Sequence, residues 1–364
     1  MRDISLRVLN RTLLDRQLLL NRDSRPALGV IERLVALQSQ EPNWPYIGLW
    51  ARAAEFHTDH LMWLLTTRQV VRAAGVRRTL HLMASADVRW LRPTIQPILD
   101  RGSQSRYFTS ETSGLDVNEL ISVGVNLLGP NTLSRRDLAR GLADKWPGRN
   151  GRILAAALEL HVPLVHSPGT SAWGKWGSPS GVEVTRAETV IGALSDTAQP
   201  ETMIRRYLGA FGPATAMDFQ SWSGLTRMEQ IFEGMRPGLR VYLTDEGVEL
   251  FDLPDATLAD GDLPAPVRFL PGYDNVLLGH AIRTRIVRDE DRKQVIPGHA
   301  IVRPTFLVDG FVAGIWSLQR SRLFVMPFRP LSDVARAEVA AEAERLVEFL
   351  APDAPFGEIS IDGV

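Results

Sequence analysis

The most constraining feature of the sequence is a series of helical segments that ends twice at the same kind of break. Apolar residues at helical spacing cover 120–128 and stop at Gly129-Pro130-Asn131-Thr132. A second helical run, over 204–208, stops at the similar Gly212-Pro213-Ala214-Thr215. Because the break returns in the same context, we expect the chain to contain copies of one small unit.

Two more helical segments and short strands follow each break. After the first break, Ser134 and Asp137 form an N-terminal capping pattern, a helical run covers 153–160, and 162–165 is strand-like. After the second break, two apolar helical segments precede alternating strands on either side of Asp245-Glu246-Gly247, which predicts a hairpin. Three helices followed by a strand pair is the order of a winged-helix unit.

The two ends of the chain complete this organisation. The N-terminal region predicts a looser copy, with helices over 6–14, 27–40 and 59–65 and a hairpin joining 70–72 to 78–82. From Pro264 onward, the sequence pattern changes from helical segments to short strand-like segments, and a final helix is expected over 334–350. This pattern suggests a small sheet or partial barrel. The expected strands cover 267–270, 282–287, 300–303, 306–308, 312–318 and 323–328.

We therefore predict an α+β fold class with three tandem winged-helix units and a small C-terminal β-barrel-like domain. The expected boundaries are 1–112, 113–198 and 199–263 for the units, and 264–364 for the β-rich domain with its helix. Helical repeats of this size also build solenoids, but a strand pair after every third helix favours winged helices.

Composition excludes several classes of function. Cysteine is absent, which rules out disulfides, thiol catalysis and thiolate zinc sites. The histidines show no zincin pattern, and the glycine loops of nucleotide-binding proteins and the nucleophile elbow of hydrolases are missing, so we expect no metal and no cofactor. No apolar run approaches the ~20 residues of a membrane span and no secretory signal is visible, so we expect a soluble, cytoplasmic monomer.

Charge is unevenly distributed along the chain although the net charge is only −1. All but three of the 41 basic residues are arginines, and they concentrate in 68–92 and 135–152, whereas acidic residues concentrate in the C-terminal tail. A basic face opposite an acidic one suits a polyanion such as duplex DNA, and arginine suits phosphates and guanine edges. A GC-rich genome is the alternative explanation of the arginine content.

Two neutral amides, Gln38 and Gln40, lie near the end of the helix expected over 27–40. Residues two apart point to different faces of a helix, so these amides can share one site only if the chain leaves the helix there. Pro42 favours such a departure because it disfavours helical backbone at Glu41. Taken alone, such a pair is more often a solvated helix end.

Three segments together resemble the bacterial winged-helix DNA glycosylases of the AlkZ type. They are Leu37-Gln38-Ser39-Gln40, the basic stretch from Val71 to Leu82, and the stretch from Phe269 to His280. The resemblance implies three winged helices around a concave basic surface, with Gln38 and Gln40 as the catalytic pair. It implies excision of N7-alkylated purines and unhooking of azinomycin-type interstrand crosslinks in duplex DNA, by hydrolysis of the N-glycosidic bond. Ser39 departs from the family, which usually has an aliphatic residue there.

Further site residues follow from charge and from the resemblance. Tyr273, Asp274 and His280 are candidates to support the damaged nucleotide, although the aspartate can simply cap its turn. His81 can likewise be a half-packed strand residue, and Arg320 and Arg322 can form an ordinary exposed hairpin tip or probe the minor groove. The DNA-binding candidates are Arg72, Arg77, Arg78, His81, Arg135, Arg136, Arg149, Arg152, Lys175, Arg320 and Arg322.

Two other functions use the same units. A winged-helix transcriptional regulator would bind one operator tightly, and a non-catalytic lesion-binding protein would confer drug resistance by sequestration. Three copies with a β-rich end suit wrapping around a lesion better than either.

Overall fold

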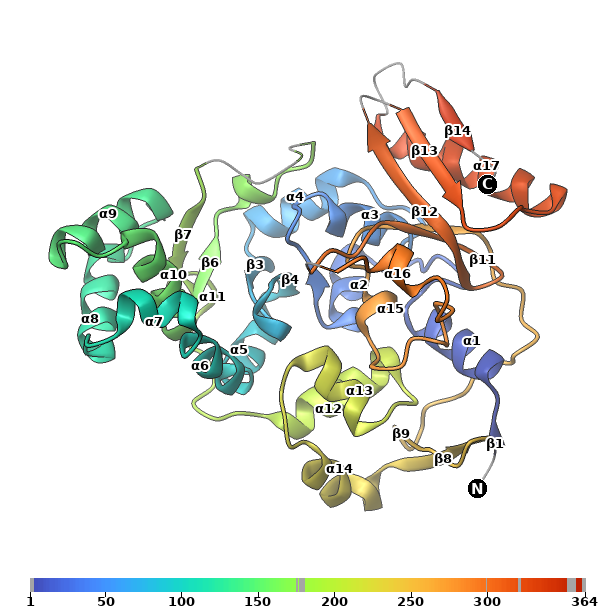
Figure 1. The fold of residues 1–364 in the computed structure, drawn as a ribbon, viewed down its shortest axis with the longest axis horizontal. Helices are drawn as coiled ribbons and strands as arrows, with labels where there is room; N and C mark the ends of the chain where they lie inside the picture. The colour runs from blue at the N-terminus through green and yellow to red at the C-terminus, as the bar shows by residue number, and fades with distance from the viewer. Residues whose placement is uncertain are drawn as a thin grey trace.

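Three open sheets with helices packed around them organise the part of the chain that the structure describes (Figure 1). The structure is a computed structural model, and it describes residues 3–174, 176, 181–298, 300–319, 322–351 and 358–361. Helices and strands are mixed along the chain, which confirms the α+β class. Among these residues, no helix is long and apolar enough to cross a membrane.

The largest sheet has six strands in the order β2-β4-β3-β6-β7-β5. All its neighbouring strands are antiparallel, and the single register pair Ala73↔Val165 joins β3 to β6. Hairpins from two distant parts of the sequence therefore share one sheet. The strands are β2 (Leu37–Gln38), β3 (Val70–Ala74), β4 (Leu80–Ala84), β5 (Leu133–Ser134), β6 (Leu164–His166) and β7 (Glu183–Arg186).

Helices surround this sheet in two groups. The N-terminal group is α1 (Leu6–Arg16), α2 (Ala27–Leu34), α3 (Trp44–Trp50), α4 (Thr58–Thr66), the 3₁₀ turn η1 (Val76–Arg78), α5 (Ser85–Thr94) and α6 (Gln96–Ser103). The second group is α7 (Arg106–Thr112), α8 (Val117–Leu128), α9 (Arg135–Lys145), α10 (Gly151–His161), η2 (Pro168–Ser171) and α11 (Ala187–Ile191). Ser134 Oγ accepts a hydrogen bond from the Asp137 amide at 3.1 Å, which confirms the predicted start of α9.

A third group of elements lies at the bottom of Figure 1. It contains α12 (Pro200–Phe211), α13 (Ala216–Ser223), α14 (Glu229–Met235), η3 (Arg236–Gly238), β8 (Arg240–Thr244) and β9 (Glu249–Asp252). The hairpin around Asp245-Glu246-Gly247 is confirmed, and β1 (Asp3–Ile4) adds to it in parallel beside β8. The N-terminal strand therefore completes a sheet whose other two strands come from the second half of the chain.

The C-terminal sheet is open, so the predicted β-barrel-like domain is wrong. Its order is β10-β11-β12-β13-β14, and the two outer strands do not pair with each other. Instead of barrel closure, β14 adds in parallel to β13 at one edge. The elements are β10 (Arg268–Leu270), α15 (Asn275–Leu278), α16 (Arg292–Val295), β11 (Thr305–Val308), β12 (Phe311–Gln319), β13 (Arg322–Pro327), α17 (Asp333–Leu350) and β14 (Ile359–Ile361).

Two further expectations for this region are wrong. The segment 282–287 is a series of bends and turns rather than a strand, and the amides of Ile286 and Val287 both donate to the carbonyl of Arg283. The segment 300–303 has an isolated bridge at Ile301 in place of a strand. Not every glutamate of α17 faces solvent. Glu342 is buried, and its carboxylate lies 2.7 Å from Arg22 and 3.7 Å from Arg268.

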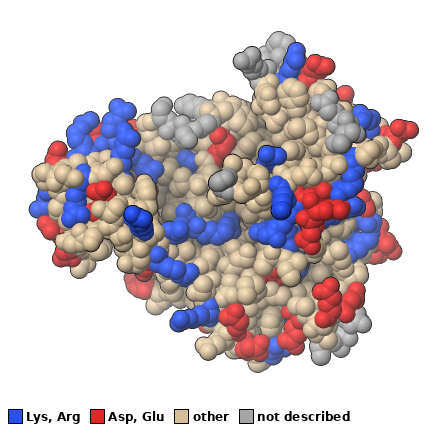
Figure 2. Space-filling view, viewed as in Figure 1, with Lys and Arg blue, Asp and Glu red and all other residues tan. Residues whose placement is uncertain are grey.

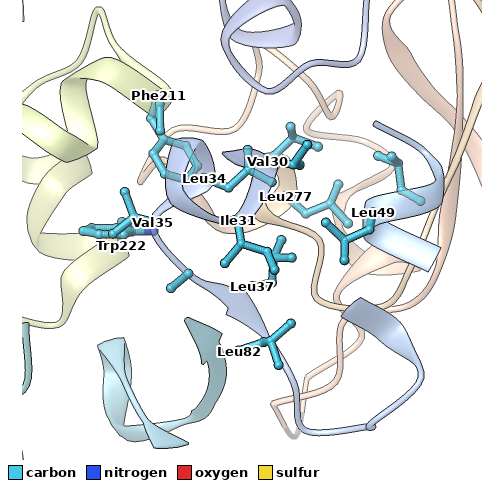
Figure 3. Packing of buried hydrophobic residues seen from close by; sticks show 14 of the residues in the cluster. Val30, Ile31, Leu34, Val35, Leu37, Leu49, Leu82, Phe211, Trp222 and Leu277 are labelled. Carbon is cyan, nitrogen blue, oxygen red and sulfur yellow. The ribbon is translucent and has the colours of Figure 1, made fainter. Parts of the chain in front are cut away.

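One large apolar core connects distant parts of the chain around the segment that contains Gln38. Figure 3 shows Ile31, Leu37 and Leu82 from α2, β2 and β4 together with Trp222 from α13 and Leu277 from α15. Residues 120–184 contribute a second, separate core. The backbone before Gln38 is therefore held by packing against elements that come much later in the sequence.

Candidate active site

Both glutamines lie beyond the end of α2, so the predicted helix over 27–40 is wrong at its C-terminal end. Helix α2 ends at Leu34, and Val35 takes a left-handed backbone conformation with φ of 69°. Gln38 then pairs with His81 of β4, and the Ser39 amide donates to the Leu80 carbonyl at 2.7 Å. Gln38 ends the two-residue strand β2, and Gln40 lies at a bend two residues later, beside the same strand β4 through its contact with the Leu80 amide.

Gln38 is nearly buried and is held by an arginine. Its exposed fraction is 7%, and its Oε1 accepts a hydrogen bond from Arg77 Nη2 at 2.9 Å. Arg77 Nη1 donates to the main-chain carbonyl of Trp222 at 2.5 Å. Burial, followed by repulsion from Arg283, lowers the pKa of Arg77 to about 10, so this side chain remains cationic at neutral pH. Arg77 was predicted to bind DNA, and the structure places it against the amide of Gln38.

Gln40 is exposed, in contrast to Gln38. Its Oε1 lies 3.4 Å from the Leu80 amide, a long hydrogen bond that leaves the oxygen able to accept another. Its main-chain carbonyl accepts a hydrogen bond from Arg72 Nη2 at 3.2 Å, and the Ser39 carbonyl accepts from Arg72 Nε at 2.9 Å.

Arg72 and His81 lie inside the protein, which corrects the prediction that they contact DNA. Their exposed fractions are 2% and 1%, so neither side chain can reach a phosphate or a base edge. Arg72 instead holds the backbone of the glutamine segment. The His81 imidazole contacts the Thr79 carbonyl through Nδ1 at 3.0 Å, and burial, with repulsion from Arg77, lowers its pKa to about 3.

The buried histidines predict that the protein loses stability in mild acid. Burial also lowers the pKa of His166 to about 3, whereas both histidines return to about 6.5 on unfolding. Below pH 6.5 the unfolded chain therefore binds protons that the folded protein cannot bind. Each histidine should then cost up to about 1.4 kcal/mol per pH unit. These two histidines should together lower the free energy of unfolding in urea by about 2 to 3 kcal/mol between pH 7.5 and pH 5.5, and the buried His280, whose pKa is also lowered, should add to this loss.

A double variant, His81→Asn with His166→Asn, serves as the control for this prediction and should show a weaker pH dependence. Equal stability of the wild type at pH 7.5, 6.5 and 5.5 would contradict the prediction.

The third motif supports the glutamine segment through a residue that the sequence did not single out. Asn275 Nδ2 donates to the Ala36 carbonyl at 3.0 Å, two residues before Gln38. Asp274 instead caps α15 by accepting from the Val276 amide, and it forms a buried ion pair with Arg52. Its turn also places Tyr273, which is half-buried, at φ of 61°. The capping interpretation of Asp274 is thus confirmed.

His280 lies in the interior, away from solvent. Its exposed fraction is 1%, and its Nε2 is 3.1 Å from the Phe211 carbonyl. Burial lowers its pKa. Neither His280 nor Asp274 has a hydrogen bond to Gln38 or Gln40 within the described ranges, so their position favours support of the fold over contact with a nucleotide.

Basic side chains gather on one face of the molecule. Figure 2 shows lysines and arginines on the lobe that carries α8 to α10 and in a band across the middle of the face. Arg78, Arg136, Arg152 and Arg322 are exposed. Arg136 and Arg152, with Arg135, Arg140 and Tyr107, also line a cavity of about 810 Å³.

Two other predicted DNA-binding residues, Arg135 and Arg149, form contacts within the protein. Arg135 pairs with Glu159 at 2.7 Å, and Arg149 donates to the carbonyls of Glu111 and Ser113. Lys175 and Arg320 lie outside the described residues. Across the described part of the chain, no cluster of three or more histidine, aspartate or glutamate side chains is arranged to hold a metal ion.

The family model, the sequence relative and the solved structure that match this chain are all described as DNA glycosylases. A family model described as DNA glycosylase AlkZ-like matches residues 31–349. An interstrand DNA cross-link repair glycosylase of Streptomyces sahachiroi is 25% identical over 353 residues, which cover 86% of this chain and 88% of that protein. The solved structure of the Streptomyces sahachiroi DNA glycosylase AlkZ matches with a TM-score of 0.80 and 22% identity, covering 99% of this chain and 100% of that chain. At this identity, the structural match shows a shared fold.

Proposed function

The chain belongs to the AlkZ-like DNA glycosylase family, and from this premise we propose that it hydrolyses the N-glycosidic bond of N7-alkylated purines in duplex DNA. The observation that carries the proposal is the pair of carboxamides next to strand β4, in which the cationic Arg77 holds the oxygen of Gln38 and the exposed Gln40 lies against the Leu80 amide. Gln38 and Gln40 are the proposed catalytic residues.

The chemistry suits uncharged side chains. Alkylation at N7 makes guanine cationic, so its bond to C1′ is already weak and breaks through an oxocarbenium-like state. A general acid or base contributes roughly 10² to 10⁴ in rate, about 3 to 5 kcal/mol, and glutamine cannot ionise to supply it. Two amides can instead hold a water molecule near C1′ and orient it by hydrogen bonds.

Catalysis by two neutral amides predicts that the protein excises only a narrow range of lesions. We expect fast release of N7-methylguanine from a duplex under single-turnover conditions, and no release of uracil, because a neutral base with a strong glycosidic bond needs acid or base catalysis. Ethenoadenine, a neutral alkylated purine, should be a poor substrate. Formation of alkali-labile abasic sites in matched oligonucleotides measures all three rates. Robust release of uracil would contradict the proposal.

We further propose that the protein unhooks interstrand crosslinks of the azinomycin type. The Streptomyces sahachiroi relative is named as an interstrand DNA cross-link repair glycosylase, and a crosslink through N7 carries the same cationic purine. A duplex crosslinked through N7 of two purines should separate into single strands on a denaturing gel after incubation with the protein. Tight lesion binding without strand separation or abasic sites would instead identify a sequestration protein.

The proposed DNA-binding arrangement consists of three winged-helix units around a concave surface. The units are 1–112, 113–198 and 199–263, and the β-rich domain with its C-terminal helix, 264–364, follows them. The hairpins β3–β4, β6–β7 and β8–β9, each preceded by helices, support this division. We propose that the protein acts as a monomer and without a lyase step, and that basic side chains contact phosphates. These contacts should make binding strongly salt-dependent and largely independent of sequence, unlike the binding of an operator by a regulator. The proposed contacts are Arg78, Arg135, Arg136, Arg149, Arg152, Lys175, Arg320 and Arg322.

A further inference from the structure

We propose that Arg77 is a positioning residue that fixes the amide of Gln38, so that Gln38 acts as a hydrogen-bond donor and Gln40 as the acceptor. This inference rests on the proposed function and adds a distinct role for each amide. It concerns which atom of Gln38 is available to the reaction.

The orientation of the Gln38 amide follows from the chemistry of its partner. A guanidinium group has only donors, so the atom of Gln38 that lies 2.9 Å from Arg77 Nη2 must be the oxygen. Exchanging the oxygen and the nitrogen of the amide would place two donors against each other. The Nε2 group of Gln38 must therefore point away from Arg77.

Arg77 itself is fixed from a second side. Its Nη1 donates to the Trp222 carbonyl at the end of α13, 145 residues away in the sequence. The turn that carries Arg77 packs closely on the same helix end, because a Cβ atom at Gly224 would lie 3.3 Å from Arg77 Cα. The guanidinium thus bridges Gln38 and α13, and it cannot rotate away from Gln38 without losing the second bond.

The Nε2 group of Gln38 is left for water or substrate. This group forms no hydrogen bond to another described residue, and Gln38 is 7% exposed. A cation on the amide oxygen polarises the amide, which strengthens Nε2 as a donor. A water molecule that accepts from Nε2 must direct its own protons elsewhere.

Gln40 has the free acceptor that such a water molecule needs. Among the described residues, its Oε1 is contacted by the Leu80 amide alone, at a long distance of 3.4 Å, so one lone pair is available. The water would then be held by donation from Gln38 and would donate to Gln40, which leaves its second lone pair to bond to C1′. As the bond from C1′ to N9 breaks, the cationic base leaves as a neutral purine, and the extra proton of the bound water passes to solvent. Both amides are required, but they are not interchangeable.

Replacing Gln38 by glutamate tests the donor role directly. Glutamate has nearly the same shape, and its carboxylate would pair with Arg77, but it has no donor. We expect Gln38→Glu to release N7-methylguanine as slowly as Gln38→Ala. If Gln38 used its oxygen as an acceptor, Gln38→Glu would keep the wild-type rate, and that result would overturn the inference.

Replacing Arg77 by methionine tests the positioning role. At saturating protein, the single-turnover rate should fall by about 10- to 100-fold, as expected for losing one charge-assisted hydrogen bond, while the Kd for the duplex changes less. The double variant Arg77→Met with Gln38→Ala should be no slower than Gln38→Ala alone, because both changes remove the same interaction. Arg77→Lys, which keeps the charge but cannot reach both partners, should recover only part of the rate.

Arg236→Met is the matched control for Arg77→Met. Arg236→Met removes a surface arginine of η3 that pairs with Glu233 and Glu249, and it should leave rate and Kd unchanged. If Arg77→Met weakens binding but not the saturated rate, or if its effect multiplies with that of Gln38→Ala, Arg77 is a DNA contact and the inference is wrong. A wild type that releases no base would refute the proposed function, whereas an active wild type with an active Gln38→Glu variant refutes only this inference.

Discussion

Replacing Gln38 by alanine is expected to slow the release of N7-methylguanine from a duplex by about 100- to 1,000-fold, the usual cost of removing one preorganised hydrogen-bond donor from an active site. Gln40→Ala should cause a loss of similar size, because the water molecule then has no acceptor. The Kd for the lesion-containing duplex should change little, since phosphate contacts dominate DNA affinity.

Rates should be measured with excess protein, and Kd by fluorescence anisotropy on the same duplex. Ser39→Ala is a matched control from the same segment. The Ser39 side chain is fully buried and its hydroxyl forms no hydrogen bond within the described chain, so its removal should not reduce the rate. If Gln38→Ala and Gln40→Ala both release base at the wild-type rate, the assignment of the site fails.

Replacing Asp274 by alanine is expected to lower the free energy of unfolding by about 3 to 5 kcal/mol, because it leaves the charge of Arg52 buried and unpaired. Both side chains are almost fully buried, and the two guanidinium–carboxylate distances are both 2.8 Å. Arg52 also donates to the carbonyls of Gln17 and Gly48, so it joins α1, α3 and the turn before α15.

Urea denaturation at pH 7.5 measures this loss. Glu188→Ala is a suitable control, since it removes a carboxylate that is half-exposed and pairs with Arg186 on the surface, and it should cost less than about 1 kcal/mol. Replacing both members of the buried pair, as Arg52→Met with Asp274→Leu, should restore part of the stability because no unpaired charge remains. A loss below about 1 kcal/mol for Asp274→Ala would contradict the buried ion pair.

Local signals predicted the elements that depend on neighbouring residues. The capping of α9 by Ser134 and the hairpin around Asp245-Glu246-Gly247 both arise within a few residues, and both are present. The end of α2 was mispredicted, because the backbone after Leu34 is decided by pairing with β4, a strand that begins only at Leu80. The β-barrel-like form of the C-terminal domain was also wrong, since the alternation of strands does not say whether the outer strands meet.

Charge alone could not show which arginines reach the surface. Arg72 and Arg78 belong to one basic stretch, yet the first is buried under the glutamine segment and the second is exposed. A buried arginine needs carbonyls at the right distance, and those that accept from Arg72 belong to Ser39 and Gln40. Nothing in the sequence near Arg72 indicates that arrangement.

The chemical nature of the site was determined by the sequence alone. The residues at 38 and 40 are amides that cannot ionise, cysteine is absent, and the arginines that surround the site are cationic whatever the fold. Only the tertiary structure decided how these groups are oriented, because the contacts that orient them join residues far apart in the chain. The oxygen of Gln38 meets Arg77, and Arg77 is held in turn by Trp222, so the direction of one side-chain amide depends on packing across three distant segments.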